Sequence, residues 1–526
     1  MSDTEKDIKS ASPVDEKAHV SHADHAAAIE AENAEFDMTV MQAVRMYPMA
    51  CFWAFIMSCM IIMESYDVFL INNFVSTDFF QRSFGVPNTS KPGTYVISSK
   101  WQSALSMSGQ LGALLGVCIA GPITSRVGYR WATLIGLMAM NATIFVMYFA
   151  NSLGLFFTAQ LLEGLPWGIF IANAPAYCSE IVPMRLRAPA TQVLQMFWAI
   201  GSIIVGGVTY VYNQRQDKTS YTVPIAIQWM FPTPLAVIFW FAPESPWWLV
   251  RRGNYERALV SIKRLGAKTE EKAQDSLAMM RRVVELEQQD KAPSYLDCFR
   301  GTDLRRTLIV CGVYAAQNLT GNLIANQAVF FFEQAGMDNK TAFGLGLITS
   351  ALQMIFVMLS WILTTYFGRR PIYLWGSAFN FLMLICLGIA GSVGTSSAAS
   401  NAQASFGLIA SVMFTFAAAP VSWAVIGETS ALRLRPLTTG IGRATYYIVE
   451  IPCIFLGTYM LNPTGGNLGG RCGYVWGATA FVCWAVAWWG LPEMKGRSYR
   501  ELDILFRRKV PARKFKTTQI GIDDDE

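Results

Sequence analysis

Long apolar runs separated by short polar stretches dominate the pattern of positions along this chain. Six runs precede Pro243, near 47–76, 101–124, 130–150, 153–177, 189–212 and 224–242. Six more follow, near 306–335, 342–367, 371–394, 403–428, 437–460 and 473–491. About 20 apolar residues in a helix cross a hydrocarbon core of about 30 Å, so each run predicts one membrane span. The pattern therefore predicts an all-α membrane protein with twelve transmembrane helices.

The polar stretches divide the chain into five parts. We expect a disordered cytoplasmic tail over 1–46, a six-helix bundle over 47–242, a linker over 243–305, a second six-helix bundle over 306–491 and a cytoplasmic C-terminal tail over 492–526. Two segments of the linker place apolar residues at helical spacing among charges. They predict short amphipathic helices on a membrane surface.

Three short sequence motifs, here called words, occur twice in the chain. The pairs are EIVPMRLRA with ETSALRLRP, SRVGYR with TYFGRR, and PESPWW with PEMKGR. The second copies start 248, 240 and 249 positions after the first. This period is too long for a solenoid and indicates two homologous halves of one assembly. The twelve spans are therefore expected to form two pseudo-symmetric bundles.

Composition and charge agree with a membrane protein. Hydrophobic residues make up 53% of the chain and charged residues 15%, whereas a soluble chain carries roughly a quarter charged residues. The Lys and Arg residues of the linker, of the repeated loop words and of the segment RRKVPARKFK lie on alternate loops, which the positive-inside rule places in the cytoplasm with both termini. They are spread over one membrane face, so we expect contact with a lipid bilayer and no nucleic acid. Asn88 and Asn339 begin glycosylation words on loops that this topology places outside.

Five segments together resemble the signature segments of the sugar porters of the major facilitator superfamily. They are SEIVPMRLR, PESPWWLVRRG, FGRRP, WAVIGE and PEMKGRSYREL. SYLDCFRGTDLRRT and MESYDVFLINNF are similar to the fungal proton-coupled branch, which includes α-glucoside permeases. The resemblance implies a sugar transporter that works by alternating access. Gln160 and Tyr129 depart from it, because each stands where the family usually has Arg.

Charged residues that fall within the predicted spans include Glu64, Asp67, Glu163, Arg443 and Glu450. A charge at the bilayer centre costs about 2.5–3.5 kcal/mol or more, so we expect such residues to face a water-filled cavity and to pair. The resemblance aligns Asp67 with the family's proton-carrying Asp. We therefore predict Asp67 as proton carrier, Glu64 and Glu163 as supporting groups and Arg443 as counter-charge, whereas Glu450 is expected to be structural. The alternative is a static buried salt bridge that orients helices.

Amide and aromatic side chains suit a sugar, which offers hydroxyls and flat C–H faces. The resemblance assigns Gln195, the QNLTGN segment and Trp423 to such a site. The predicted substrate-binding residues are Gln192, Gln195, Gln317, Asn318, Asn322, Asn326 and Trp423, and Gln327 continues the same polar face. The alternative is that these amides join helices, at about 0.6 kcal/mol per hydrogen bond.

The repeated loop words place Glu and Arg together in each half. The resemblance implies ion pairs that latch the cytoplasmic side and break when it opens. The predicted gate residues are Arg126, Arg130, Glu180, Arg185, Glu244, Arg369, Arg370, Glu428, Arg433 and Glu493. Exposed pairs are weak, about 0–1 kcal/mol each, which suits a latch that opens in every cycle. The alternative is that the Arg residues serve only to orient the chain during insertion.

We therefore predict a monomeric plasma-membrane importer that carries a mono- or disaccharide with protons. We expect no enzymatic activity, no metal and no cofactor, with the proton gradient as driving force. Three alternatives stay open: a facilitator that ignores protons, a nutrient sensor that does not transport, and an exporter of a small polyol or metabolite.

Overall fold

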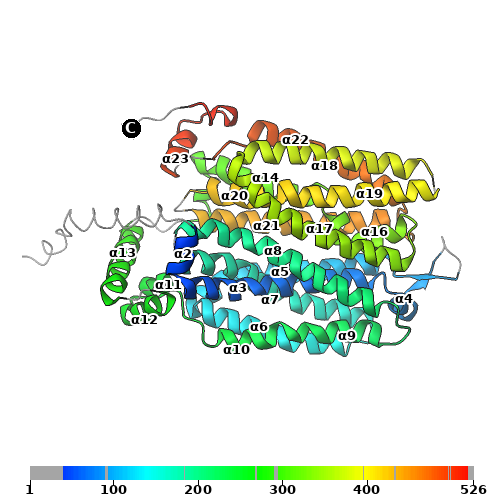
Figure 1. Cartoon of the computed structure of the whole chain (residues 1–526), viewed down its shortest axis with the longest axis horizontal. Coiled ribbons are helices and arrows are strands. Elements are labelled where there is room, and N and C mark those ends of the chain that lie inside the picture. The colour runs from blue at the N-terminus through cyan, green and yellow to red at the C-terminus, as the bar shows by residue number, and fades with distance from the viewer. Residues whose placement is uncertain are drawn as a thin grey trace, which may run out of the picture.

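The computed structural model describes residues 40–88, 93–182, 184–266, 269–289, 294–394, 396–431, 434–495, 497 and 499–518. Within that part of the chain, ten helical stretches are long and apolar enough to cross a membrane. Two further apolar segments run beside them, and the twelve together form two six-helix bundles (Figure 1). Of the tail predicted to be disordered over 1–46, residues 1–39 lie outside the described part, whereas Val40–Met46 form a helix, so the prediction is wrong there.

The first bundle is formed by the first half of the chain. Its spans are α3 (Pro48–Phe74), α5 (Ser99–Val127), α6 (Tyr129–Tyr148), α7 (Leu153–Ile181), α8 (Met184–Tyr212) and a broken sixth span of α9 (Thr219–Ile227), the 3-10 turn η2 (Gln228–Met230) and α10 (Pro232–Phe239). Helix α2 (Val40–Met46) precedes them. Helix α4 (Asp78–Phe84) and the antiparallel strands β1 (Val86–Pro87) and β2 (Tyr95–Val96), with Val86 opposite Val96, connect α3 to α5.

The second bundle repeats this plan. Its spans are a broken first span of α14 (Gly301–Leu319), α15 (Leu323–Asn326) and α16 (Ala328–Gln334), then α17 (Asn339–Tyr366), α18 (Arg369–Ser392), α19 (Ser397–Met413) continued by α20 (Ala419–Thr429), α21 (Arg435–Leu461) and α22 (Cys472–Gly490). The apolar run near 306–335 is therefore three helices and not one. The break contains Gly321, whose φ of 83° lies in the left-handed region that glycine tolerates best.

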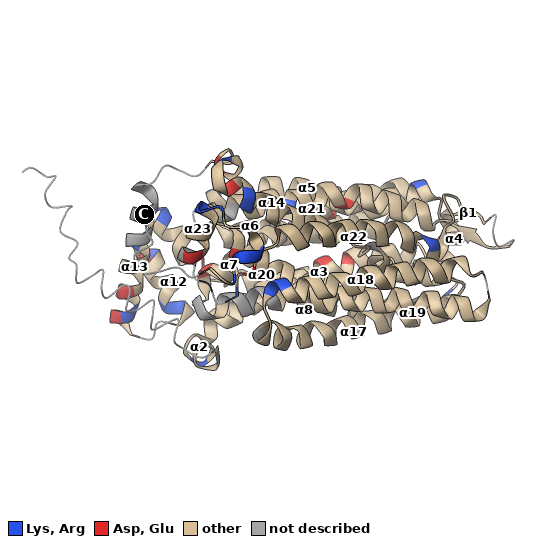
Figure 2. Cartoon of the chain, turned by 90° about the horizontal axis from the view of Figure 1, so that it is seen from above, with Lys and Arg blue, Asp and Glu red and all other residues tan. Residues whose placement is uncertain are grey.

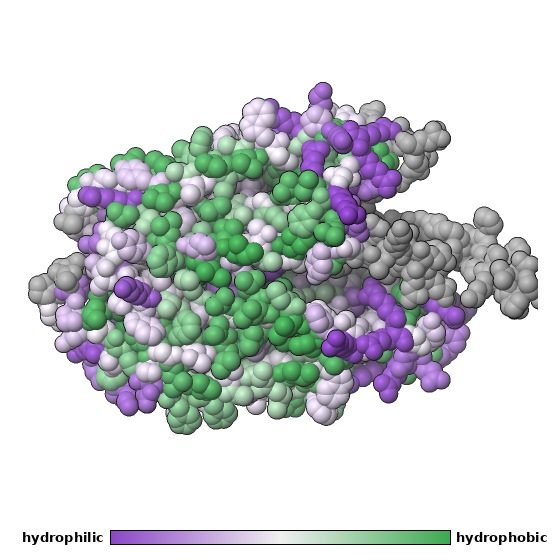
Figure 3. Space-filling view, turned by 180° about the vertical axis from the view of Figure 1, so that it is seen from behind, coloured by the Kyte–Doolittle hydropathy of each residue, from purple (hydrophilic) through white to green (hydrophobic). Residues whose placement is uncertain are grey.

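The two bundles lie side by side along one direction, with the first in blue to green and the second in yellow to red (Figure 1). We call the end with α11 (Pro246–Arg251), α12 (Tyr255–Leu265) and α13 (Glu270–Gln289) the linker end, and the end with β1 and β2 the hairpin end. Hydrophobic residues cover the middle of the face shown in Figure 3, and hydrophilic residues gather toward the two ends. Charged residues concentrate at the linker end (Figure 2). This belt is the surface expected of a chain that spans a bilayer.

The segment after the last span is folded against the second bundle. Helix α23 (Tyr499–Arg507) buries Leu502, Leu505 and Phe506 there. Arg306 Nη2 of α14 also contacts Asp503 Oδ1 of α23 at 2.6 Å. Much of the predicted C-terminal tail is therefore an ordered cap on the linker end of the second bundle.

Glycines set the packing between α5 and α7. A Cβ on Gly112 would lie 2.2 Å from the carbonyl oxygen of Leu161, and a Cβ on Gly164 would lie 2.2 Å from that of Gly109. Gly116 and Gly168 repeat the arrangement one turn further along, where a Cβ on Gly116 would lie 2.3 Å from Leu165 O. Small residues at a spacing of four let the two helix backbones approach closely. This contact fixes α7, which carries Glu163, against its neighbours.

Candidate functional site

Asp67 lies in α3 and is 0% exposed. Each of its carboxylate oxygens accepts one hydrogen bond within the first bundle. Gln228 Nε2 in η2 donates to Oδ1 at 2.7 Å, and Trp167 Nε1 in α7 donates to Oδ2 at 3.2 Å. The break in the sixth span places Gln228 against α3. Two neutral donors thus solvate a carboxyl group that lies deep within the protein.

Glu163 lies four residues before Trp167 in α7, so both side chains point to one face of the helix. Glu163 is also 0% exposed, and neither of its carboxylate oxygens has a hydrogen-bond partner among the described residues. Glu163 and Asp67 interact electrostatically. Because two like charges without a nearby cation are costly in such a place, this pair suits the holding of a proton.

Glu64 lies one turn before Asp67 in α3, and the charges of the two carboxyl groups interact. Arg443, in α21 of the second bundle, interacts electrostatically with Glu64. The Arg443 guanidinium lies 4.5 Å from the ring centroid of Tyr446 and 4.9 Å from that of Tyr447, and its Nη2 donates to Tyr447 Oη at 3.2 Å. Within the predicted quartet, Asp67 thus interacts with both Glu163 and Glu64, and Glu64 also interacts with Arg443. The positive charge acts across the interface between the bundles.

Glu450 lies seven residues after Arg443, two turns along α21. Its Oε1 accepts a hydrogen bond from Tyr446 Oη at 3.3 Å, and its charge interacts with that of Arg443. It is fully buried beside the Glu64–Arg443 cluster. This position is compatible with the structural role expected for it.

Several of the predicted sugar-binding side chains meet between the bundles. Trp423 Nε1, from α20, donates to Gln195 Oε1, from α8, at 3.3 Å, so one pair joins the two halves. The π-helical turn η4 (Phe414–Ala418) directly precedes α20, and such turns change the register of the side chains that follow. Tyr314 packs edge-on against both Trp423 and Tyr446, at centroid distances of 6.1 and 6.2 Å.

The break between α14 and α15 carries a second group of amides. Gln317 is 9% exposed, and its Nε2 has no hydrogen-bond partner in the described part of the chain. Asn318 Nδ2 donates to the carbonyl oxygen of Tyr446 at 3.1 Å, and Gln327 Nε2 donates to Thr458 Oγ1 at 3.1 Å. Asn322 lies at the start of α15 and is partly buried. Gln317 is therefore the amide of this group with a donor left for a ligand, while Asn318 and Gln327 join helices.

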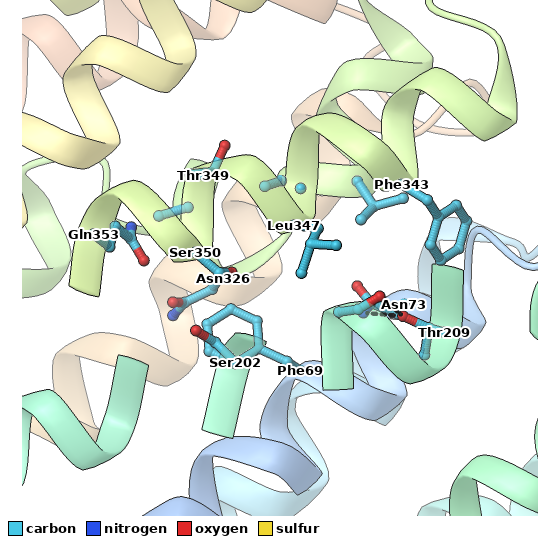
Figure 4. Close-up of a pocket in the computed structure, with 15 residues that line it drawn as sticks. Phe69, Asn73, Ser202, Thr209, Asn326, Phe343, Leu347, Thr349, Ser350 and Gln353 are labelled. Atoms are coloured by element: carbon cyan, nitrogen blue, oxygen red, sulfur yellow. Dashed lines mark hydrogen bonds between the residues drawn. The ribbon is translucent and has the colours of Figure 1, made fainter. Parts of the chain in front are cut away.

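Asn326 lines a pocket between the bundles (Figure 4). The first bundle contributes Phe69, Ser202 and the Asn73–Thr209 hydrogen-bonded pair, and the second contributes Asn326, Phe343 and side chains of α17. The residues of α17 that line it include Leu347, Thr349, Ser350 and Gln353. Polar groups and aromatic rings from both halves thus line this space.

The first linker-end latch surrounds Glu180, near the end of α7. Arg251 Nη1 of α11 contacts Glu180 Oε1 at 3.2 Å, Tyr129 Oη donates to the same oxygen at 3.2 Å, and Ser245 Oγ donates to Oε2. The ion-pair partner is thus Arg251, and not Arg126 or Arg130 as the sequence suggested. Arg126 is exposed and takes part in no ion pair among the described residues. Arg130 Nη2 donates to the carbonyl oxygen of Trp240.

In the second half an ion pair joins Glu428 to Arg369, one of the two neighbouring Arg residues expected from the sequence. Arg369 Nη2 contacts Glu428 Oε1 at 2.9 Å. Arg370 Nη2 donates to the carbonyl oxygen of Trp488 at 2.8 Å, which matches the contact of Arg130 with Trp240. The two halves therefore use the same arrangement at the linker end, except for the Arg that pairs with Glu180.

Glu244 and Glu493 cap equivalent helices. Glu244 accepts the backbone N–H of Tyr129 at 2.9 Å at the start of α6, and Glu493 accepts that of Arg369 at 3.0 Å at the start of α18. Carboxylates are favourable at a helix N-terminus because the first N–H groups have no partner within the helix. The carboxylates come so close that a Cβ on Gly128 or Gly368 would lie 2.4 or 2.1 Å from them. The repeated motifs therefore carry glycine at these two positions because any larger residue would collide with the carboxylates.

Three predicted side chains, those of Gln192, Arg185 and Arg433, lie outside the described part of the chain. Two residues that contact Asp67, Trp167 and Gln228, were not predicted. Gln228 had a signal in the sequence, since it is the one amide in the apolar run near 224–242. No such signal in the sequence indicated Trp167, because its contact with Asp67 depends on the close approach of α7 to α3.

Two bundles that enclose buried carboxyls and unpaired amides define a membrane transport protein. The chain belongs to the sugar transporter family, since the family described as "Sugar (and other) transporter" matches residues 53–506. This confirms the resemblance that the sequence carries. It also agrees with the expectation that the protein is no enzyme, because the family consists of transporters.

Relatives from Saccharomyces cerevisiae are similar over most of the chain. The alpha-glucosides permease MPH3 (strain YJM789) is 34% identical over 504 residues, which cover 93% of this chain and 83% of that protein. The maltose permease MAL31 (strain ATCC 204508 / S288c) is 34% identical over 501 residues, which cover 93% and 81%.

Solved structures of the xylose transporter XylE from E. coli share the fold. The inward-open conformation has a TM-score of 0.69 at 16% identity, covering 87% of this chain and 99% of that chain. The complex of this proton:xylose symporter with 6-bromo-6-deoxy-D-glucose has a TM-score of 0.65 at 16% identity, covering 85% and 99%. The twelve-helix fold of the major facilitator superfamily is therefore established for this chain.

Proposed function

We propose that this chain imports a sugar together with a proton, and that an α-glucoside such as maltose is the first substrate to test. The observation that carries the coupling is the buried pair of Asp67 and Glu163, which has no basic partner within 4.0 Å in the described part of the chain. The names of the yeast relatives support an α-glucoside as substrate.

Each group of the site has a proposed role. Asp67 carries the proton, and Glu163 is close enough for the two carboxyls to share it. Trp167 and Gln228 hold the Asp67 carboxylate while the proton is away, because each donates a hydrogen bond to it. Asp67 is fully buried here, so protons reach it in another conformation of the cycle.

The sugar site is proposed to lie between the bundles. Trp423 offers an aromatic surface, while Gln195 and Gln317 offer amide groups from the two halves. Glu64 and Arg443 lie across the same interface, so a change in the distance between the bundles changes their attraction. This arrangement lets the rocking of the halves affect both substrate and charge.

We further propose that the linker end faces the cytoplasm, that both termini lie there, and that the protein acts as a monomer in the plasma membrane. The gathering of Lys and Arg at the linker end supports this orientation (Figure 2). The proton gradient is the proposed driving force, without a cofactor.

Uptake in cells that lack their own carriers tests the proposal. Labelled maltose, glucose and a polyol are supplied with and without a protonophore. We expect maltose to accumulate and the protonophore to abolish accumulation. Uptake that rises no higher than the external concentration and ignores the protonophore indicates a facilitator, no uptake of any sugar indicates a sensor, and loss of preloaded polyol indicates an exporter. Each of these three results overturns the proposal.

A further inference from the structure

The hairpin end is joined across the two bundles by side-chain amides. Asn462, the residue after α21, is 0% exposed. Its Nδ2 donates to Gln102 Oε1 at 2.5 Å and to the carbonyl oxygen of Ile97 at 2.9 Å, both at the start of α5. Its Oδ1 accepts from Thr464 Oγ1, which in turn accepts the backbone N–H of Ser99 at 2.8 Å. The end of one bundle's fifth span thus holds the start of the other bundle's second span.

A second contact joins the same kinds of element with the bundles exchanged. Asn213, the residue after α8, is 3% exposed, and its Nδ2 donates to Asn339 Oδ1 at the first residue of α17. Asn339 Nδ2 donates to the carbonyl oxygen of Ser76 at 2.9 Å, after α3, and to Glu333 Oε1 at 2.8 Å within its own bundle. The start of α17 is therefore tied to the ends of two helices of the first bundle.

The two contacts are related by the internal repeat. Asn462 follows Asn213 by 249 positions, the offset of the PESPWW and PEMKGR words. Asn339 follows Ser99 by 240 positions, the offset of the SRVGYR and TYFGRR words, and these residues are the first of α17 and α5. Both contacts therefore lie at equivalent positions of the two halves, although the sequences around these positions share no motif.

We propose that Asn213 with Asn339, and Asn462 with Gln102, are a pair of amide latches that close the hairpin end in this conformation. The role of these latches rests on the proposed transport function, in which every transport cycle breaks and re-forms them. Amide groups suit this task because water replaces their hydrogen bonds when the end opens, so little is lost in either state. Because they are neutral, salt and pH act on them far less than on the ion pairs at the linker end.

Chemical labelling tests the latches without requiring transport. The reporter is Ser350→Cys, a buried residue that lines the pocket of Figure 4, in a full-length chain whose ten native cysteines are replaced. Labelling by a maleimide is measured on the purified protein in detergent. We expect Asn213→Ala with Asn462→Ala to label faster than the parent, and each single variant to lie between. Because each substitution removes about one hydrogen bond, we expect the labelling rate to rise about twofold to tenfold for each latch that is lost.

Asn141→Ala is the matched control. Its Nδ2 donates to Leu137 O and its Oδ1 accepts from Thr233, both within the first bundle. Labelling that stays unchanged in the double variant, or that rises equally in Asn141→Ala, overturns the inference. Faster labelling in a protein that transports no sugar upholds the latches and overturns the proposed function instead.

A cross-link gives a second test in case the alanine variants fold poorly. Asn213→Cys with Asn339→Cys, in the cysteine-replaced chain without the reporter, is oxidised and its uptake is measured. We expect a bond that holds the two halves together after protease cleavage of the linker, and uptake that stops until a reductant is added. Normal uptake by the cross-linked protein overturns the inference, as does a pair of cysteines that does not form the bond.

Discussion

Asp67 shows how single residues can create a coupling site. Its carboxyl lies in the interior of the first bundle, where the hydrogen-bond donors are the neutral Trp167 and Gln228. Neutral donors stabilise a carboxylate without fixing its charge, whereas a close Arg would hold it ionised. The group can therefore both release and regain a proton, and the unpaired Glu163 lies beside it.

Replacing Trp167 by Phe removes one donor and keeps an aromatic ring in the same space. We expect coupled uptake to fall by about tenfold, because a hydrogen bond to a charged group contributes about 1.5–3 kcal/mol. The control is Trp484→Phe, which removes a similar bond, to Leu374 O at 3.1 Å, within the second bundle. Initial rates of labelled sugar uptake compare the two. Equal losses in both variants contradict a specific role of Trp167.

Replacing Gln317 is expected to weaken sugar binding without lowering the stability of the protein. Its buried Nε2 without a partner is a cost to the folded state, about 1–3 kcal/mol for such a group. We expect Gln317→Leu to melt no lower than the parent protein while its KM for sugar rises about tenfold or more. The control Gln327→Leu removes the bond to Thr458 and should lower the melting temperature. A normal KM in Gln317→Leu contradicts the proposed contact with sugar.

At the scale of helices, the glycines between α5 and α7 determine how α7 is placed. Gly164→Val is expected to destabilise the protein by about 1–3 kcal/mol or to prevent folding, because its side chain meets the backbone of Gly109 and Gly112. Gly207→Val in α8 is the control, since a Cβ there meets nothing within 4 Å. Thermal unfolding of the purified proteins measures both. Similar melting temperatures would falsify the close-packing explanation.

The loop between α10 and α11 makes stability depend on pH. Burial raises the pKa of Glu244 from 4.5 to about 7, although the backbone N–H groups of Ser245, Arg130 and Tyr129 oppose this, and the charge of Glu180 adds to the rise. Between these two values the unfolded chain has released a proton that the folded protein still holds. Stability therefore falls as the pH rises from about 4.5 to 7.

We expect Glu244→Gln to lose this component. Its melting temperature should fall less than that of the parent protein between pH 5 and pH 8. Glu256→Gln, on the exposed face of the linker, removes the same charge elsewhere and controls for net charge. If the two variants and the parent protein show the same dependence on pH, the burial of Glu244 does not determine it.

At the scale of the whole molecule, two equivalent halves use different chemistry at their two ends. Carboxylate and guanidinium groups serve the linker end, and amides serve the hairpin end. Charged residues gather at the linker end (Figure 2), as the proposed orientation requires. Both sets are formed in this conformation, and the amide contacts join the two bundles, whereas the ion pairs do not.

Much of this architecture is predictable from the sequence, because spans follow from apolar length and the halves from repeated words. The Arg369–Glu428 pair was predictable for the same reason. The partners of Asp67 and Glu180 were not, because Gln228, Trp167 and Arg251 reach them through the break in the sixth span, glycine packing and the fold of the linker. The amide latches were not predictable from repeated sequence motifs, because Asn213 and Asn462 bind different partners in the opposite half.

Proton movement with sugar in proteoliposomes decides whether Asp67 carries the coupled proton. The purified protein is reconstituted with an entrapped pH dye, and a maltose gradient is applied. We expect maltose entry to acidify the vesicles of the parent protein, and Asp67→Asn to exchange maltose without moving protons. Maltose entry that acidifies the Asp67→Asn vesicles as fast as those of the parent protein would contradict this role for Asp67.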